Sequence, residues 1–183
     1  MRLFFAVKLP EDLKSALGDF IMPFRGLPAR VKWVEPRNMH LTLKFLGETD
    51  REQLDELKAA ATEAAGGASP FELNIYGSGA FPNLRRPRVF WVGIDDLQKG
   101  LQNLQKTLDY NLGQIGFETE SKKFSPHLTL GRVKERGEIG QLGEAFSRAV
   151  FPPVKVAVSE FFLIESKLRP TGPVYTDLIR FPL

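Results

Sequence analysis

The feature that most constrains this chain of 183 residues is a repeated tetrapeptide. The chain has two histidines, His40 and His127, and each one opens the segment His-Leu-Thr-Leu. With 24 leucines and 8 threonines in the chain, Leu-Thr-Leu is expected to follow a given histidine by chance roughly once in a thousand times. The two segments lie 87 residues apart, one in each half. We therefore interpret the chain as an internal duplication.

The predicted elements occur in a similar order around each histidine. Hydrophobic patterning predicts strands over residues 3–7, 31–34, 40–46, 71–76, 89–94, 127–133, 156–164 and 174–181. Helices are predicted to begin near Pro10 and at Asp50, to carry the leucine stripe from Leu97 to Leu112, and to cover residues 139–149. The Pro- and Gly-rich stretches 77–87 and 168–173 are predicted to be loops.

These elements predict an α+β fold, because strands and helices mix without strict alternation. We expect a single domain of residues 1–183 made of two similar lobes, approximately 1–80 and 85–175, and we allow for strand exchange between them. Packing of the lobes about a pseudo-twofold axis would place two mainly antiparallel sheets along a central cleft, with helices on the outer faces. Such a cleft is a natural ligand site.

Composition narrows the class of protein. Hydrophobic residues make up 43% of the chain and include 15 phenylalanines, which is enough for a packed core. The sequence has no apolar run of about 18 residues, no cysteine and no signal-peptide pattern at its start. We expect a cytoplasmic, monomeric protein that does not associate with a membrane. The net charge of +3 is compatible with an anionic partner.

Strand geometry predicts how each repeated segment is used. Side chains alternate between the two faces of a strand, so His40 and Thr42 share one face while Leu41 and Leu43 point to the other. The second copy repeats this arrangement. Each motif would bury two leucines and present an imidazole and a hydroxyl on the opposite face, and paired lobes would bring all four polar groups into one groove.

The histidines have two other interpretations. A single histidine on a strand is more often a hydrogen-bonded core residue, but two identical motifs at equivalent places favour a functional role. A metal site would need carboxylates to complete the coordination sphere, and no Asp or Glu accompanies either motif at ligand spacing. We therefore expect neither a metal ion nor another cofactor.

Paired histidines without cysteine suit the cleavage of a phosphoester at a ribose. One neutral imidazole can take a proton from the attacking oxygen while a protonated one gives a proton to the departing oxygen. The hydroxyls of Thr42 and Thr129 are predicted to hold the phosphoryl oxygens. Arg132 follows the second motif on the same strand and is a candidate for a bidentate phosphate contact.

The two motifs resemble the paired His-x-Thr/Ser-x motifs of the two-histidine phosphoesterase superfamily. The chain is most similar to the RNA 2′,3′-cyclic phosphodiesterases of bacteria and archaea, also described as 2′-5′ RNA ligases. Stretches in family order carry this resemblance over nearly the whole length: MRLFFAVKLP, NMHLTLKFLGE, RRPRVFWVG, FSPHLTLGR and ESKLRPTGPVYTDLIRFPL.

The resemblance implies a bilobal α+β fold and hydrolysis of a terminal 2′,3′-cyclic phosphate to a 2′-phosphomonoester without metal. It also implies that His40 is the proton donor and His127 the proton acceptor, which the identical motifs cannot distinguish by themselves. The implied partner is RNA with a 2′,3′-cyclic phosphate end, tRNA halves among them, with weak 2′-5′ ligation as the reverse reaction.

Other residues are candidates for binding the rest of the substrate. Aromatic side chains that would stack on a base are Trp33, Phe45, Phe124 and Tyr175. Basic clusters around Arg30 and Arg85 are candidates for backbone phosphates. Two alternative functions stay open at this point: a phosphodiesterase for small cyclic nucleotides or 2′-5′ oligonucleotides, and a non-catalytic module that binds RNA ends.

Overall fold

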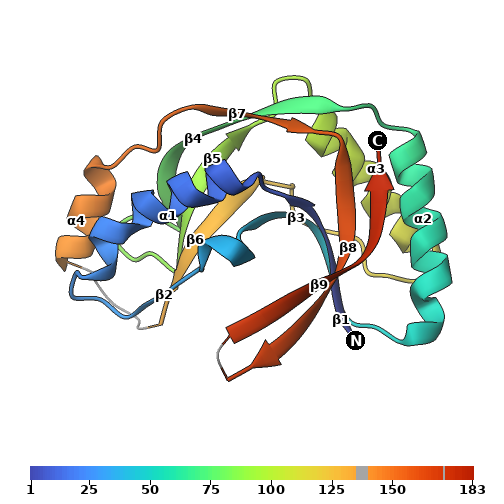
Figure 1. The fold of residues 1–183 in the computed structure, drawn as a ribbon, viewed down its shortest axis with the longest axis horizontal. Helices are drawn as coiled ribbons and strands as arrows, with labels where there is room; N and C mark the ends of the chain where they lie inside the picture. Colours follow the sequence, from blue (N-terminus) through green and yellow to red (C-terminus); the bar gives the residue numbers. More distant parts are fainter. Residues whose placement is uncertain (135–139, 171) are drawn as a thin grey trace.

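A computed structural model describes residues 1–134, 140–170 and 172–183. It has an α+β fold with two antiparallel sheets (Figure 1). The strands are β1 (Arg2–Lys8), β2 (Val31–Trp33), β3 (His40–Glu48), β4 (Phe71–Phe81), β5 (Val89–Asp95), β6 (His127–Val133), β7 (Val154–Val158), β8 (Glu160–Arg169) and β9 (Gly172–Pro182). The helices in the described part are α1 (Glu11–Arg25), α2 (Leu54–Gly66), α3 (Gly100–Gln114) and α4 (Gly140–Arg148), with short 3₁₀ turns η1 (Pro36–Asn38) and η2 (Arg51–Gln53).

The strand order of the two sheets reveals the internal symmetry. The first sheet has the order β3-β1-β8-β9 and the second the order β2-β6-β5-β4-β7. Within them, the unit β3-β1-β8 corresponds to the unit β6-β5-β4, and in each unit the third strand comes from the other half of the sequence. The first sheet thus contains β8 from the second half of the chain, the second sheet contains β4 from the first half, and each histidine strand, β3 or β6, is the first strand of its unit.

Helices cover the outer faces of the two sheets (Figure 1). The helices α2 and α3 pack on one another and contact strands β9 and β3 of the first sheet. The helix α1 contacts α4 and β2, and α4 contacts β4, on the side of the second sheet. A capping box precedes the second helix, with Asp50 and Gln53 exchanging hydrogen bonds. This cap closes the turn η2, which leads directly into α2.

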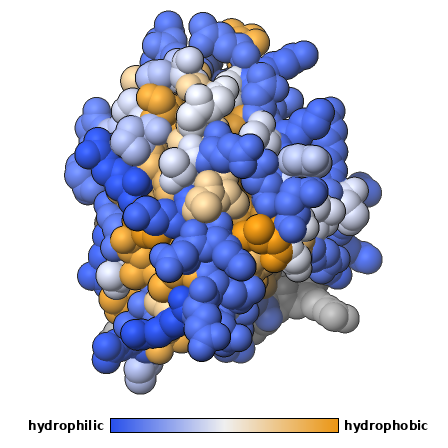
Figure 2. All heavy atoms as spheres, turned by 90° about the vertical axis from the view of Figure 1, so that its right-hand side faces the viewer, coloured by the Kyte–Doolittle hydropathy of each residue, from blue (hydrophilic) through white to orange (hydrophobic). Residues whose placement is uncertain are grey.

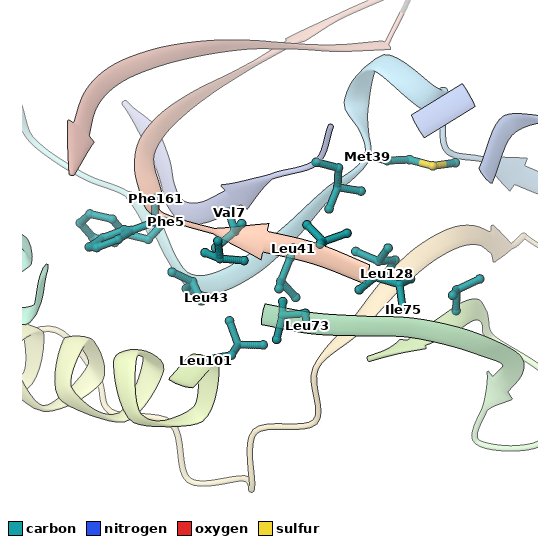
Figure 3. Close-up of a cluster of buried hydrophobic side chains, with 14 of the residues drawn as sticks. Phe5, Val7, Met39, Leu41, Leu43, Leu73, Ile75, Leu101, Leu128 and Phe161 are labelled. Atoms are coloured by element: carbon teal, nitrogen blue, oxygen red, sulfur yellow. The ribbon is translucent and has the colours of Figure 1, made fainter. Parts of the chain in front are cut away.

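The hydrophobic core joins side chains of both sheets to those of the helices that cover them (Figure 3). Leu41 and Leu43 from the first motif are 1% and 3% exposed, and Leu128 and Leu130 from the second are 1% and 0% exposed. Full burial of a leucine side chain contributes about 1.5–3 kcal/mol, so the four together hold the two histidine strands firmly against the core. The alternation predicted from the sequence is confirmed for both motifs.

The strand predicted over residues 156–164 is wrong in one respect, because it is two strands. β7 pairs with β4 in the second sheet, whereas β8 pairs with β1 in the first. The chain changes sheets at Ser159, whose carbonyl accepts a hydrogen bond from the Leu183 N–H. The polar pair Ser159-Glu160 stands at the break, but the apolar residues on either side of it read as one strand because each side is buried in its own sheet.

Two predicted loops also differ from the structure. Residues 77–81 of the stretch 77–87 belong to β4. Gly77 adopts a φ of +69° and interrupts the regular pairing with β5, which resumes at Ser78 and continues to Phe81. A glycine in a strand often marks such a bulge rather than a loop. In the stretch 168–173, strands β8 and β9 form a hairpin and pair as far as Arg169 and Gly172.

The helix boundaries differ at two positions. Leu97 is 83% exposed and precedes α3, which begins at Gly100, so this leucine does not belong to the buried stripe. The side chain of Asp96 instead accepts a hydrogen bond from the Gln102 N–H at the start of the helix. The fourth helix is predicted from residue 139, which lies outside the described residues, and α4 is described from Gly140.

The surface over α2 is mostly hydrophilic, with apolar side chains scattered among polar ones (Figure 2). No helix in the described part of the chain has the length and apolar character needed to cross a membrane.

Candidate active site

A groove with a volume of about 570 Å³ lies between strands β3 and β6. These two strands contact one another, and β3 is an edge strand of its sheet. β2 pairs only with residues 131–133 of β6, beyond the second tetrapeptide. The groove is lined by eight of the candidate residues: His40, Thr42, Phe45, Phe124, His127, Thr129, Arg132 and Tyr175.

The two histidine rings are oriented in the same way. The Nδ1 atom of His40 lies 2.8 Å from the carbonyl oxygen of Asn38, and the Nδ1 atom of His127 lies 2.8 Å from the carbonyl oxygen of Ser125. Because a carbonyl oxygen only accepts hydrogen bonds, each Nδ1 carries the proton. Each Nε2 is therefore left to accept a proton when the ring is neutral or to donate one when it is charged.

His40 lies between two aromatic rings. The centroid of its ring is 4.8 Å from that of Phe4 and 5.3 Å from that of Tyr175. Burial lowers the pKa of His40, and the positive charge of Lys14 lowers it further, while the hydrogen bond to Asn38 acts in the opposite direction. The neutral imidazole is thus favoured at this position in the absence of a ligand.

His127 has one aromatic neighbour of this kind among the described contacts. The ring of Phe81 meets it edge-on with centroids 5.1 Å apart, and Phe81 in turn packs on Trp91. Phe81 also lines the groove. The sequence pattern does not reveal this residue, because it falls in the stretch 77–87 that is predicted to be a loop.

The candidate phosphate-binding residues lie along the same two strands. Thr42 and Thr129 follow their histidines by two positions and share their face, so each hydroxyl is directed to the groove. Arg132 is exposed at the end of β6. Its positive charge partly offsets the rise in the pKa of Tyr175 that burial causes. Arg132 of the second sheet is therefore close enough to Tyr175 of the first sheet for its charge to affect the tyrosine side chain.

Comparison with known proteins agrees with this geometry. The family model for LigT-like phosphoesterases matches the chain twice, over residues 7–91 and over residues 92–175. The chain belongs to the LigT-like phosphoesterase family. The boundary between the two matches separates the two histidine motifs, so the family model and the repeated tetrapeptide describe the same duplication.

Relatives and solved structures cover the whole chain. An RNA 2′,3′-cyclic phosphodiesterase from Methanothermobacter thermautotrophicus is 37% identical over 100% of this chain and 99% of its own length. The crystal structure of TT0787 from Thermus thermophilus has a TM-score of 0.80 at 35% identity, covering 100% of this chain and 98% of that one. The LigT of E. coli complexed with 3′-AMP has a TM-score of 0.79 at 28% identity, covering 100% and 97%.

The aromatic candidates of this family member differ in their positions. Phe45 is 61% exposed at the rim of the groove, whereas Phe124 and Tyr175 are half-buried in its wall. Trp33, also considered as a stacking residue, packs instead between Phe24 and Phe90, with ring centroids 6.3 and 5.6 Å away. It belongs to the core because β2 pairs with the far end of β6, where its ring covers the backbone of Gly131.

The positive charges of the groove come mainly from residues that the sequence pattern does not single out. Lys44, Lys122 and Lys123 line it together with Arg132. The clusters around Arg30 and Arg85 are not among its described lining residues. Lys122 and Lys123 precede the second motif in a segment without regular secondary structure, which has no periodic pattern to place them by.

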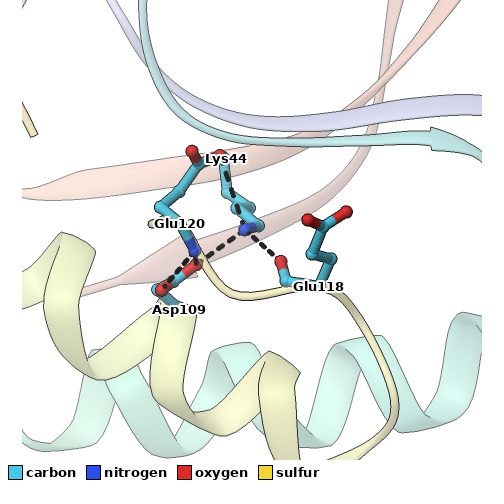
Figure 4. A network of polar contacts seen from close by, with 4 residues as sticks. All are labelled: Lys44, Asp109, Glu118 and Glu120. Atoms are coloured by element: carbon cyan, nitrogen blue, oxygen red, sulfur yellow. Dashed lines mark hydrogen bonds and ion pairs between the residues drawn. The ribbon is translucent and has the colours of Figure 1, made fainter. Parts of the chain in front are cut away.

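Lys44 joins the first histidine strand to the segment that precedes the second (Figure 4). Its side chain is 4% exposed, and its Nζ lies 2.7 Å from the carboxylate of Asp109 and 2.6 Å from the carbonyl oxygen of Glu118. The carboxylate of Asp109 also accepts a hydrogen bond from the Glu120 N–H. This network fixes the start of the segment that leads to Ser125, whose carbonyl orients His127.

Among the described residues, no three His, Asp or Glu side chains are grouped so that they could hold a metal ion.

Proposed function

We propose that this protein hydrolyses the 2′,3′-cyclic phosphate at the end of an RNA to a 2′-phosphomonoester. The observation that carries the proposal is the matched pair of histidines. Both rings donate Nδ1–H to a backbone carbonyl and line one groove. The names of full-length relatives at about 35% identity, RNA 2′,3′-cyclic phosphodiesterase, support the same activity.

In the proposed reaction, water attacks the phosphorus and the bond to the 3′ oxygen breaks. His127 takes the proton from the attacking water through Nε2, and His40 gives a proton through Nε2 to the departing 3′ oxygen. The hydroxyls of Thr42 and Thr129 and the guanidinium of Arg132 hold the non-bridging oxygens, where negative charge must be stabilised. The same steps, with a 5′-hydroxyl in place of water as the nucleophile, would give weak 2′-5′ ligation.

The assignment of His40 as acid requires a source for its charge, because burial lowers the pKa of this ring. A cyclic phosphate bound next to His40 is anionic, and a nearby negative charge favours the imidazolium. We therefore expect His40 to take up its proton when the phosphate binds. Calorimetric titration with a nucleoside 2′-monophosphate, repeated in buffers of different ionisation enthalpy, measures that uptake.

The uptake distinguishes the two histidines. His40→Asn should abolish proton uptake on binding, whereas His127→Asn should leave it in place. If the uptake disappears with His127→Asn alone, the roles of the two histidines are reversed.

The activity itself is tested with a short oligoribonucleotide that ends in a 2′,3′-cyclic phosphate, incubated with the protein in EDTA. The expected product carries its phosphate on the 2′ oxygen, which phosphorus NMR distinguishes from a 3′-phosphate. A protein that binds this oligonucleotide and returns it unchanged would be a binding module, and the proposal would be wrong.

The substrate class is tested by a panel in the same assay. Nucleoside 2′,3′-cyclic monophosphates, 2′-5′ linked oligonucleotides and cyclic-ended tRNA halves are compared with the oligonucleotide by kcat/KM. A groove of about 570 Å³ with an exposed aromatic ring at its rim suits a terminal nucleotide and a base stacked outside it. We expect the RNA ends to have the highest kcat/KM.

A further inference from the structure

A second cavity adjoins the main groove at His40. It has a volume of about 390 Å³ and shares Asn38, Met39, His40 and Tyr175 with the groove. The two spaces therefore have His40 in a shared wall. The remaining lining residues come from β1, α1, η1, β8 and β9: Lys8, Lys14, Arg37, Ile164, Thr176 and Asp177.

The lining of this cavity is predominantly cationic. Lys8, Lys14 and Arg37 contribute three positive charges, and Asp177 contributes one negative charge. The charge of Lys14 reaches His40, since it lowers the pKa of that ring. A cavity with this balance attracts an anion of the size of a phosphate group.

The positions of the two lysines are set by the protein. Lys8 lies 2.6 Å from the Asp177 carboxylate, and its Nζ is 5.1 Å from the centre of the Phe162 ring. Lys14 is held 2.7 Å from the Glu11 carboxylate and its side chain is 9% exposed, whereas that of Glu11 is 84% exposed. Water therefore largely screens the charge of the Glu11 carboxylate, whereas the side chain of Lys14 beside the cavity is shielded from water.

Arg37 differs from the two lysines. It is exposed at the mouth of the cavity, and the described part of the chain provides no ion-pair partner for it. Its guanidinium is free to make a bidentate contact with a phosphate, which is the geometry that arginine provides best.

We propose that this cavity is a second phosphate subsite, which takes the phosphate on the 5′ side of the terminal nucleotide. The inference rests on the proposed function, because it places the cyclic phosphate between the two histidines. In an RNA end, the ribose that carries the cyclic phosphate is joined through its 5′ oxygen to the next phosphate. That phosphate follows the strand out of the groove, and the space past His40 supplies both room and positive charge for it.

The subsite predicts a preference that can be measured as a ratio. Adenosine 2′,3′-cyclic phosphate is compared with the same compound carrying a 5′-phosphate, and with a dinucleotide whose internal phosphodiester takes that place. We expect kcat/KM to be about tenfold higher for the two compounds with the extra phosphate, which is the gain typical of a charge-assisted hydrogen bond. Equal kcat/KM for all three compounds would overturn the proposal.

Variants locate the source of the preference. Arg37→Ala should lower the ratio of kcat/KM between the 5′-phosphorylated and unphosphorylated compounds to about one or two, and Arg37→Lys should keep part of it. Because the ratio is taken within one variant, a general effect on catalysis cancels. Arg51→Ala, an exposed arginine in η2, is the matched control and should keep the full ratio.

Two other results would contradict the assignment of the subsite. If Lys122→Ala with Lys123→Ala removes the ratio while Arg37→Ala keeps it, the 5′ phosphate lies along the groove and not past His40. A dinucleotide that gains nothing where the 5′-phosphate gains tenfold would show a site for a terminal phosphate and not for an RNA strand.

A binding experiment separates the subsite from the proposed function. The affinity of adenosine 3′,5′-bisphosphate is compared with that of adenosine 3′-monophosphate by calorimetry, which needs no turnover. A tenfold tighter binding of the bisphosphate that Arg37→Ala removes supports the subsite even for a protein that hydrolyses none of the cyclic compounds. Equal affinities overturn the subsite even for an active phosphodiesterase.

Discussion

The two halves of the site have the same four-residue motif but different surroundings. In both, the histidine donates Nδ1–H to the carbonyl two positions earlier, and two leucines enter the core. His40, however, is enclosed by Phe4 and Tyr175, with a cationic cavity behind it. His127 meets Phe81 alone among the described ring contacts and lies beside the lysines of the groove.

The difference separates what a motif encodes from what the fold adds. Ring orientation depends on the local backbone, so it is identical in the two copies. The rings packed against each histidine come from other strands, which are β1 and β9 for His40 and β4 for His127. Two copies of one sequence motif thus have different surroundings because different strands pack around them.

The residue that follows each motif also differs between the two copies according to the segments packed around it. Lys44 follows the first tetrapeptide and ties β3 to the segment before β6. Gly131 follows the second, where an added Cβ would approach the Trp33 ring to 2.7 Å. One strand needs a long cation at this position and the other has no room for a side chain, so the two positions cannot be exchanged.

The largest expected effect is the loss of either histidine. We predict that His40→Ala and His127→Ala each lower kcat for the cyclic-ended oligonucleotide by at least about 100-fold, the range for losing a general acid or base. The double variant should lose little more than the worse single variant, because both residues act in one step. Activity close to wild type in any of these, with folding verified by circular dichroism, would contradict acid–base catalysis by this pair.

A second prediction concerns the link that Lys44 makes between the halves. Lys44→Met removes the buried partner of Asp109, which is 14% exposed. Loss of one member of a buried ion pair typically costs about 3–5 kcal/mol. We expect a lower free energy of unfolding in urea and faster amide hydrogen exchange in residues 118–126.

The control variant for this prediction removes both charges of the pair, so that no unpaired charge stays buried. Lys44→Met combined with Asp109→Leu should recover much of the lost stability, since apolar replacement of a buried pair is often nearly neutral. Exchange in residues 118–126 should stay fast, because the contact with the Glu118 carbonyl is still missing. A single Lys44→Met variant as stable as the wild type would show that the network does not hold the halves together.

The sequence predicts the features that depend on local pattern. The two motifs, their buried leucines and the α+β class follow from alternation and periodicity, and the structure confirms them. Family resemblance supplies the roles of the histidines, which the identical motifs cannot distinguish. The structure brings the candidate residues into one groove, while their roles stay predictions.

The features that the sequence does not reveal depend on contacts between distant segments. Phe81 is assigned to a loop because Gly77 and Pro82 flank it, although β4 continues through the bulge at Gly77. Lys44 resembles an ordinary charged residue of a strand, and only the approach of α3 explains its burial. The switch between β7 and β8 occurs at the polar pair Ser159-Glu160, which interrupts the apolar run but does not show that its two sides lie in different sheets.

A smaller effect is expected at the rim of the groove, where the two halves contribute different aromatic rings. Phe45→Ala should raise KM for the oligonucleotide by about tenfold, within the 1–3 kcal/mol that base stacking contributes. Stability should change little, because Phe45 is 61% exposed. Tyr110, 64% exposed on α3 and outside the described lining of the groove, is the matched control. Equal KM values for Phe45→Ala and Tyr110→Ala would remove Phe45 from the binding site.

The smallest effect is on stability and tests the enclosure of His40 directly. Burial lowers the pKa of His40 in the folded protein, whereas in the unfolded chain the ring titrates near its ordinary value of about 6.5. As the pH falls below that value, the unfolded chain takes up a proton that the folded protein still refuses. Stability from this residue is therefore present above about pH 6.5 and is lost as the pH falls towards the lower pKa of the folded state.

The free energy of unfolding in urea, measured at about pH 7.5 and again at about pH 5.5, on either side of the ordinary histidine pKa, should consequently fall less in His40→Gln than in the wild type. Other groups that titrate in this interval contribute equally to both proteins, so the difference between the two falls belongs to His40. His127→Gln is the control variant, because it also removes one histidine from the groove but does so on the other strand. An equal fall in His40→Gln and wild type would mean that Phe4 and Tyr175 do not keep the ring neutral, and the contrast between the two halves would then have to come from the bound phosphate alone.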